Sequence, residues 1–193
     1  KGLHCHIGSQ IFDIDPFELA AKVMLEFIAK ISKELSYNIS ELNLGGGFGI
    51  KYLPEHDPVP YETYMERVSI VVKQTCKELD IKQPFILIEP GRSIVGPAGI
   101  TLYTVGAVKE IPNVRTYISV DGGMSDNPRY ALYQSEYDVE IANKAFEEKA
   151  MKVTVAGKCC ESGDLIGENL PIQNAEAGDI LAVLATGAYN YSM

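Results

Sequence analysis

A short apolar run followed at once by a compact polar signature occurs three times in the first half of this chain. The runs and the signatures that follow them are residues 3–5 and 6–10, 42–44 and 45–49, and 85–88 and 89–93. Each gap between them holds a stretch with the hydrophobic spacing of a helix. A repeated order of strand, polar loop and helix is typical of a parallel α/β barrel, whose chemistry lies at the carboxyl ends of the strands. We therefore expect the C-terminal part of a TIM (β/α)8 barrel here.

Two helices are predicted between the three signatures. In the first, which ends near residue 35, we expect Asp15 as the N-cap, Pro16 as the first helical residue and Glu18 as the capping-box partner. Its expected buried stripe is Phe17, Ala20, Met24, Phe27, Ile28, Ile31 and Leu35. The second helix is expected over residues 61–79, with a buried side made of Tyr64, Val68, Val71, Val72, Cys76 and Leu79.

The pattern of predicted strands and helices changes after residue 100. Strand-like segments at residues 101–108, 116–120, 152–156 and 179–185 follow one another without a long helical pattern between them. A helix-free β-region after a βα region indicates a second, mostly antiparallel domain. We therefore expect an α/β plus β chain, with barrel units in residues 1–100 and a β-sandwich or Greek-key-like domain in residues 101–193. The boundary is expected between residues 95 and 107.

Composition narrows the class of protein. The chain has 193 residues, of which 46% are hydrophobic and 22% are charged, as in ordinary globular proteins. A net charge of −9 argues against nucleic-acid binding, and no apolar run reaches the roughly 18 residues of a membrane span. Four cysteines without a C-x-x-C pair argue against a zinc site and for a reducing cytoplasm. A complete barrel needs roughly 250 residues, so we interpret the chain as a piece of a longer enzyme.

The glycine run at residues 45–47 allows two interpretations. After a strand, three glycines can present bare backbone N–H groups to a phosphate. The run is neither a dinucleotide fingerprint nor a Walker loop, because Ile50 stands at the sixth position and no Gly-Lys-Ser/Thr follows. The alternative is a tight turn that needs positive φ angles. The sequence alone leaves both interpretations open.

Two other signatures place polar groups at strand ends. Glu89 and Arg92 flank a Pro-Gly turn. The carboxylate could hold a proton on a heterocyclic nitrogen, and the guanidinium could bind a phosphate or carboxylate; a local ion pair is the alternative. His6 could stack on a flat ring while Ser9 binds phosphate, and the alternative for His6 is a hydrogen-bonded core histidine.

The β-region carries three more candidate groups. Arg129 and Tyr133 could grip a carboxylate, or they could be a solvated arginine and a packed tyrosine. Cys160 and Glu161 stand on a polar turn, where the thiol could donate a proton; a buried structural cysteine is the alternative. Tyr189 follows a Gly-Ala pair at the end of a strand, where β-packing alone would explain it.

Together and in this order, these signatures resemble those of the fold-type III pyridoxal-phosphate-dependent decarboxylases, and within that family most closely the diaminopimelate decarboxylases. The resemblance extends from residues 4–10 to residues 187–189. The narrower likeness rests on His-Ile-Gly-Ser-Gln at residues 6–10, on residues 121–133, and on Cys-Glu-Ser-Gly-Asp at residues 160–164. It implies decarboxylation of meso-2,6-diaminopimelate to L-lysine and CO₂ with pyridoxal 5'-phosphate as the cofactor.

The resemblance also implies a role for each matching residue. At the cofactor it implies His6 against the ring, Glu89 at the ring nitrogen, and a phosphate cradle made of Ser9, Gly45, Gly46 and Gly47. Arg92 and Tyr189 are implied to lie near both the phosphate and the substrate. The substrate itself, a small amino acid, is implied to contact Arg129, Tyr133 and Glu161. Cys160 is implied to be the acid that protonates the carbanion, and no metal is implied.

A homodimer with shared active sites follows from the same resemblance, with the Cys160 loop reaching the partner's barrel. One residue of the family pattern has no counterpart. The Schiff-base lysine of a Tyr-Ala-x-Lys motif does not occur, and Lys1 directly precedes the first strand. We therefore expect the 193-residue chain alone to be inactive.

Three alternatives stay open at this point. One is a decarboxylase of the same fold acting on ornithine, arginine or carboxynorspermidine. Another is a non-catalytic regulatory relative that keeps the scaffold. The last is a glycine-rich phosphate-binding barrel of unrelated chemistry, which would leave Cys160, Glu161 and Tyr189 without roles.

Overall fold

The structure, a computed structural model, describes residues 1–193 and divides them into two compact units. Unit 1 comprises residues 1–50 and 57–93, and unit 2 comprises residues 51–56 and 94–193. The chain passes from one unit to the other within α3 (Arg92–Val95), just before the predicted boundary window. Segment 51–56 also belongs to unit 2, which no local sequence feature indicates, because that assignment depends on contacts with residues far along the chain.

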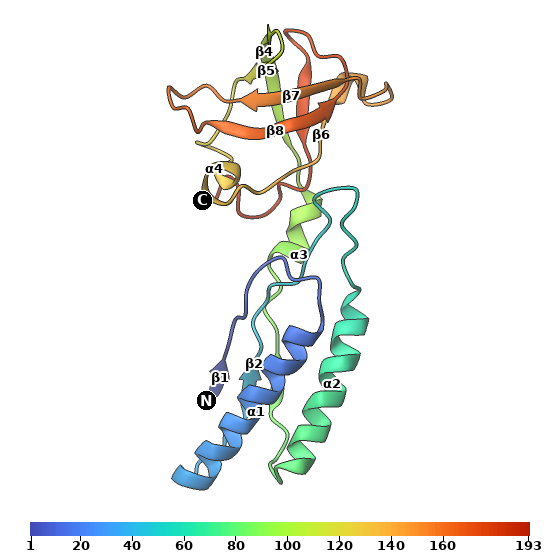
Figure 1. Ribbon diagram of the computed structural model, residues 1–193. Coiled ribbons are helices and arrows are strands. Elements are labelled where there is room, and N and C mark those ends of the chain that lie inside the picture. The colour runs from blue at the N-terminus through green and yellow to red at the C-terminus, as the bar shows by residue number, and fades with distance from the viewer. The chain divides into compact units, whose positions relative to one another are not determined.

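Unit 1 is built from parallel βα repeats. Its strands β1 (Gly2–His4), β2 (Glu41–Asn43) and β3 (Phe85–Leu87) are hydrogen-bonded in the order β1-β2-β3, all parallel. Helices α1 (Asp15–Leu35) and α2 (Tyr61–Glu78) follow the first and second strands and lie side by side (Figure 1). This is the expected partial barrel.

The core of unit 1 lies between the strands and the two helices. Leu42 of β2, together with Leu44 and Phe48 of the loop that follows it, packs with Phe17 of α1 and Tyr64 of α2. The Phe17 and Phe48 rings stack with centroids 5.0 Å apart. The buried side of α2 is as predicted at Tyr64, Val68, Val72 and Cys76, with Thr75 added. The other two predicted residues, Val71 and Leu79, are only half-buried.

The predicted stripe of α1 is partly wrong. The buried residues are Phe17, Ala21, Leu25 and Ile28, whereas Phe27 and Leu35 are exposed. Apolar residues of α1 cover more of its circumference than the side that is buried. Which of them are buried is decided by the contacts of α1 with the strands and with α2. Leu19 and Val23 therefore join Phe27 on an exposed apolar face.

The predicted start of α1 is also wrong. The N-cap position belongs to Ile14, which makes no side-chain cap, and Asp15 lies inside the helix. Both predicted capping carboxylates instead bind Arg67 of α2. Arg67 Nη2 donates to Asp15 Oδ1 at 3.0 Å, and Arg67 Nε donates to Glu18 Oε1 at 2.6 Å. An ion-paired arginine from the neighbouring helix thus replaces the local capping box.

Unit 2 is a single curled sheet with short helical turns. Its strands are β4 (Thr101–Ile111), β5 (Arg115–Val120), β6 (Val139–Ile141), β7 (Met151–Ala156), β8 (Leu165–Ile172) and β9 (Ile180–Val183). They are ordered β6-β9-β4-β5-β7-β8, and every pair except the parallel β5 and β7 is antiparallel. The two edge strands, β6 and β8, contact each other, so the sheet curls towards a barrel (Figure 1).

Strand β4 joins the two halves of this sheet. Its first part pairs with β9 and its second part with β5, with a register shift between Val105 and Ala107. The predicted sandwich-like or Greek-key-like domain therefore takes the form of one sheet whose halves share β4. Strands β6 and β8 were not predicted, because β6 is short and β8 contains Gly167, Asn169 and Pro171, which are typical of turns.

The remaining helical segments of unit 2 are short: η1 (Gly96–Ala98), α4 (Arg129–Tyr133) and η2 (Ala142–Lys144). None of the helices has the length and apolar character needed to cross a membrane.

Candidate active site

The parallel strands of unit 1 bring the three polar signatures to one edge of the sheet. His4 ends β1, Asn43 ends β2, and Glu89 follows β3 by two residues. Backbone pairing continues beyond the strands, since Cys5 N–H donates to Asn43 O at 2.9 Å and Glu89 N–H donates to Gly45 O at 2.7 Å. The start of each loop is therefore held in register with its neighbour.

The glycine loop needs its glycines for close packing. Gly45 and Gly47 have φ angles of +72° and +103°, a region that favours glycine. A Cβ added to Gly46 would lie 2.2 Å from the Glu89 carbonyl oxygen, and one added to Gly47 would lie 2.3 Å from the Gly8 carbonyl oxygen. The tight-turn interpretation thus accounts for the glycines, and the same contacts bring the loops after β1, β2 and β3 close together.

Two of the glycine N–H groups that could have been free to bind a phosphate already face acceptors within the protein. The Gly45 N–H donates to Asn43 Oδ1 at 2.8 Å, and the Gly46 N–H approaches His6 Nδ1 at 3.4 Å. The His6 ring is exposed, so it is not a core histidine. Its contact with Gly46 places an imidazole beside the glycine loop, where it can meet a ligand lying on that loop.

Arg92, in the segment after β3, meets Ser9, in the loop after β1. The Arg92 side chain is buried, and its Nη2 donates to Ser9 Oγ at 3.0 Å. The following residue, Ser93, accepts a hydrogen bond from the Tyr61 hydroxyl. A guanidinium and a hydroxyl in contact offer several donors to one anion, which suits a phosphate or a carboxylate.

Glu89 bonds with His4 and Asn43 rather than with Arg92. His4 Nε2 lies 3.1 Å from Glu89 Oε2, and Asn43 Nδ2 donates to Glu89 Oε1 at 2.9 Å. The hydrogen bond from His4, and then that from Asn43, lower the pKa of the Glu89 carboxyl below its ordinary value. The carboxylate is therefore charged at neutral pH, and the local ion pair weighed from the sequence does not form.

Sequence reasoning did not single out His4 and Asn43. The available signal was a polar residue inside each apolar run, at the last position of its strand. That signal is ambiguous by itself, because which polar strand residues face the site depends on the register between β1, β2 and β3.

Two sets of hydrogen bonds hold together the segments of unit 2 that carry its candidate residues. One set is made by the buried Asp164 carboxylate, and the other joins the Asn190 and Asn127 side-chain amides. Asp164 accepts hydrogen bonds from the Met124 N–H at 2.5 Å and the Cys159 N–H at 2.7 Å. It therefore ties the loop that carries Cys160 to the loop over residues 121–129. Cys160 and Glu161 themselves are exposed, so the buried structural cysteine is not the arrangement here.

The other candidates of unit 2 flank the 121–129 loop. Arg129 lies at the start of α4, with its guanidinium carbon 5.5 Å from the centre of the Tyr133 ring, and it donates to Ser135 Oγ at 3.1 Å. Tyr189 has a φ of 62° and is partly exposed. Its neighbour Asn190 is buried and donates to Asn127 Oδ1 at 2.8 Å, which ties the end of the chain to the same loop.

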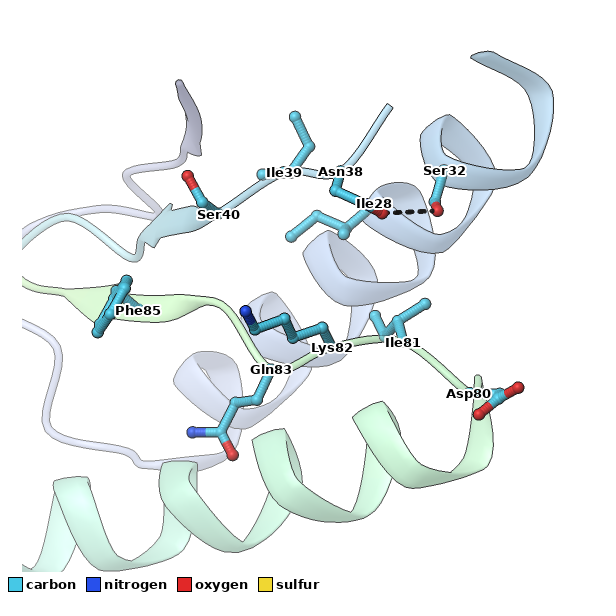
Figure 2. Close-up of a pocket in the computed structure, with 10 residues that line it drawn as sticks. All are labelled: Ile28, Ser32, Asn38, Ile39, Ser40, Asp80, Ile81, Lys82, Gln83 and Phe85. Atoms are coloured by element: carbon cyan, nitrogen blue, oxygen red, sulfur yellow. Dashed lines mark hydrogen bonds between the residues drawn. The ribbon is translucent and has the colours of Figure 1, made fainter. Parts of the chain in front are cut away.

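A cavity of about 310 Å³ in unit 1 is lined by none of the candidate site residues of unit 1 or unit 2. Figure 2 shows that its lining side chains come from α1, from the loop before β2 and from the segment between α2 and β3. Ser40 and Phe85 place it at the amino ends of β2 and β3, opposite to Glu89. Parallel α/β barrels carry their chemistry at the other end of the strands.

The unit 1 group fits pyridoxal phosphate on chemical grounds. A pyridinium nitrogen needs a charged carboxylate, which Glu89 supplies, and a phosphate needs donors, which Arg92 and Ser9 supply. An exposed imidazole at His6 can lie against a flat ring. No lysine is a member of this group.

Comparison with known proteins agrees with this chemistry. Residues 1–96 match the family model described as the pyridoxal binding domain of pyridoxal-dependent decarboxylases. Residues 85–187 match the model for the C-terminal sheet domain of the same enzymes.

Individual relatives give the same result. The diaminopimelate decarboxylases of Bacillus methanolicus and of Bacillus subtilis strain 168 are 52% and 48% identical over the whole chain. The chain spans only 44% of the length of each. The crystal structure of diaminopimelate decarboxylase from M. jannaschii in complex with L-lysine superposes with a TM-score of 0.88 at 34% identity, covering 100% of this chain and 43% of that one. The Helicobacter pylori enzyme complexed with L-lysine has a TM-score of 0.83 at 28% identity, covering 100% and 45%.

The match therefore rests on two successive domain models and on full-length similarity of this chain to part of longer enzymes. The chain belongs to the pyridoxal-dependent decarboxylase family.

Proposed function

We propose that this chain is the part of a diaminopimelate decarboxylase that carries most of its cofactor and substrate contacts, in an enzyme that converts meso-2,6-diaminopimelate to L-lysine and CO₂. One observation carries the proposal: a charged carboxylate, Glu89, and a buried guanidinium, Arg92, stand at one edge of a parallel sheet. The names of the relatives narrow the substrate to diaminopimelate.

Each residue of unit 1 then has a defined task toward pyridoxal phosphate. Glu89 holds a proton on the ring nitrogen, because a nearby negative charge favours the protonated base. Arg92 and Ser9 donate to the phosphate, and His6 lies against the ring. The glycines let the ligand approach the backbone closely. When bound, the cofactor supplies an electron sink for the carbanion that remains after CO₂ leaves.

The residues of unit 2 handle the substrate. Cys160 gives the proton of its Sγ to the substrate Cα once CO₂ has left, which is general-acid catalysis. Arg129 and Tyr133 bind the carboxylate that is retained, Glu161 binds the distal ammonium group, and Tyr189 contacts both the phosphate and the substrate. Exposure of Cys160 and Glu161 supports this assignment, since both side chains are available to a ligand.

The same proposal includes a homodimer with shared sites. The exposed segment over residues 160–163 supplies Cys160 and Glu161 to the partner subunit's unit 1. Residues 1–100 then act as the cofactor-binding barrel part, and residues 101–193 act as the domain that supplies substrate contacts and residues for the partner.

The decisive experiment measures lysine and CO₂ formation by the natural protein that carries this chain. With meso-diaminopimelate and pyridoxal phosphate we expect turnover, and with ornithine or arginine at least tenfold lower kcat/KM, since a lost charged contact costs about 1.4 kcal/mol or more. Replacing the acid in Cys160→Ala should lower kcat by about 100-fold or more. The adjacent Cys159→Ser variant is the control and should keep its activity.

Two results contradict the proposal. The first is preferred turnover of ornithine or arginine, which would assign a different substrate. The second is equal loss of activity in Cys160→Ala and Cys159→Ser, which would remove the specific role of Cys160. The 193-residue chain alone should turn over no substrate, because it offers no lysine within its cofactor group.

A further inference from the structure

Glu89 is held by side chains rather than by burial. Its side chain is 57% exposed, so packing does not fix the direction of the carboxylate. His4 Nε2 at 3.1 Å contacts Oε2, and Asn43 Nδ2 at 2.9 Å contacts Oε1. One donor on each oxygen defines the plane of the carboxylate and still leaves lone pairs for a third donor.

The orientation of the Asn43 amide follows from its other contact. Its Oδ1 accepts from the Gly45 N–H at 2.8 Å. A backbone N–H can only donate, so the oxygen of the amide must face Gly45 and the nitrogen must face Glu89. Asn43 therefore links the glycine loop to the carboxylate, and neither contact can form with the amide reversed.

The His4 contact follows from the register of the sheet. His4 pairs with Asn43 across β1 and β2, and Asn43 pairs with Leu87 across β2 and β3. The two side chains therefore start from the same level of neighbouring strands and reach Glu89 from one side. A charged carboxylate is an acceptor only, so the His4 Nε2 that faces it carries the proton. His6 is the other titratable group near this carboxylate.

We propose that His4 and Asn43 are positioning residues that orient the Glu89 carboxylate toward the nitrogen of a heterocyclic ring. They are assigned to act through Glu89, the group that both side chains contact. The inference rests on the proposed function, because it assumes that the ring is that of pyridoxal phosphate. It adds two residues with a specific effect. They favour protonation of the ring nitrogen and do not contribute to phosphate or substrate binding.

The experiment uses the natural protein loaded with pyridoxal phosphate that carries ¹⁵N at the ring nitrogen. In the unaltered protein at neutral pH, we expect the ¹⁵N chemical shift of a protonated ring. In His4→Leu the shift should move toward that of the unprotonated ring. The kcat should fall about threefold to tenfold with KM changed less than twofold, because one charge-assisted hydrogen bond to the carboxylate is lost. His4→Gln keeps an N–H donor, so its ¹⁵N chemical shift and its kcat should both lie close to those of the unaltered protein.

The control is His56→Leu. His56 accepts hydrogen bonds from the Tyr52 and Leu53 N–H groups in unit 2, so its loss removes an imidazole without touching Glu89. It should leave the ¹⁵N shift unchanged. If His4→Leu does not fold, His4→Asn replaces it, since its shorter side chain stays polar but does not reach the carboxylate. In His4→Asn the ¹⁵N chemical shift should also move toward that of the unprotonated ring.

The outcomes separate the two proposals. An unaltered protein that binds no labelled cofactor, or binds it with an unprotonated ring, refutes the proposed function and this inference with it. An unaltered protein with a protonated ring and a His4→Leu variant with the same ¹⁵N shift refutes the inference alone. A His4→Gln variant no better than His4→Leu also refutes it, since the effect would then not depend on the donor.

Discussion

Asp164 is the residue whose replacement most directly tests how unit 2 is held together. Its carboxylate is buried and accepts from the Met124 and Cys159 N–H groups at 2.5 and 2.7 Å. Cβ atoms added at Gly123 or Gly157 would lie 2.4 and 2.3 Å from the carboxylate oxygens, so the side chain fills the space that these glycines leave. In Asp164→Asn, the shape is kept but one oxygen becomes an NH₂ group, which must face one of the two N–H donors.

The cost follows from that geometry. One hydrogen bond to a charged group is lost, which contributes about 1.5–3 kcal/mol, and one partly buried backbone donor loses its acceptor. We expect Asp164→Asn to lower the free energy of unfolding of unit 2 by about 2–4 kcal/mol. The loop carrying Cys160 should also open more often, since Asp164 ties it to the loop over residues 121–129.

Two measurements check this. Urea unfolding followed by circular dichroism gives the change in free energy, and hydrogen exchange of peptides covering residues 121–129 and 157–164 gives local opening, expected to be at least about tenfold faster. Asp138→Asn is the matched control, since it also neutralises an aspartate but breaks only a partly exposed ion pair with Lys149, worth about 0–1 kcal/mol. Equal effects of the two substitutions would refute the structural role assigned to Asp164.

Two further predictions concern packing and pH. Gly46→Ala would place a Cβ 2.2 Å from the Glu89 carbonyl oxygen, so it should cost about 2 kcal/mol or more in urea unfolding and weaken cofactor binding, whereas Gly163→Ala, with nothing within 4 Å, should cost less than about 0.5 kcal/mol; similar values for both would contradict the loop packing. Hydrogen bonds from Lys144 and Asn143 lower the pKa of Asp179 to about 2, so its contribution to stability is complete above its ordinary pKa of about 3.9 and is lost as the pH falls towards 2. Asp179→Asn should therefore destabilise the protein more at pH 7 than at pH 2.5 in urea unfolding, and a pH-independent cost would count against the depressed pKa.

The candidate site residues of unit 1 could be singled out because their assembly is local in origin. Each lies within a few residues of a strand, and parallel pairing brings the ends of all three strands to one edge. His6, Ser9, Glu89 and Arg92 could therefore be named as candidates from the signatures alone. The family assignment followed from the order of those signatures, and the domain matches confirm it.

The predicted features that the structure does not show have one common cause. Asp15 and Glu18 look like capping residues, but Arg67, far along the chain, binds both of them. Strand β8 looks like a turn, but pairing with β7 makes it a strand despite Gly167 and Pro171. In each case a partner distant in sequence outweighs a local preference of a few tenths of a kcal/mol up to about 1 kcal/mol.

The sequence by itself determined the repeating βα pattern, the second β-domain, the family and the candidate site residues, because all of these can be recognised in short, contiguous stretches. The tertiary structure alone decided which polar groups face one another. That Glu89 bonds with His4 and Asn43 rather than with Arg92, and that Asp164 holds the Cys160 loop, depends on strand register and loop packing. Those are set by contacts between segments that the chain brings together only when it folds.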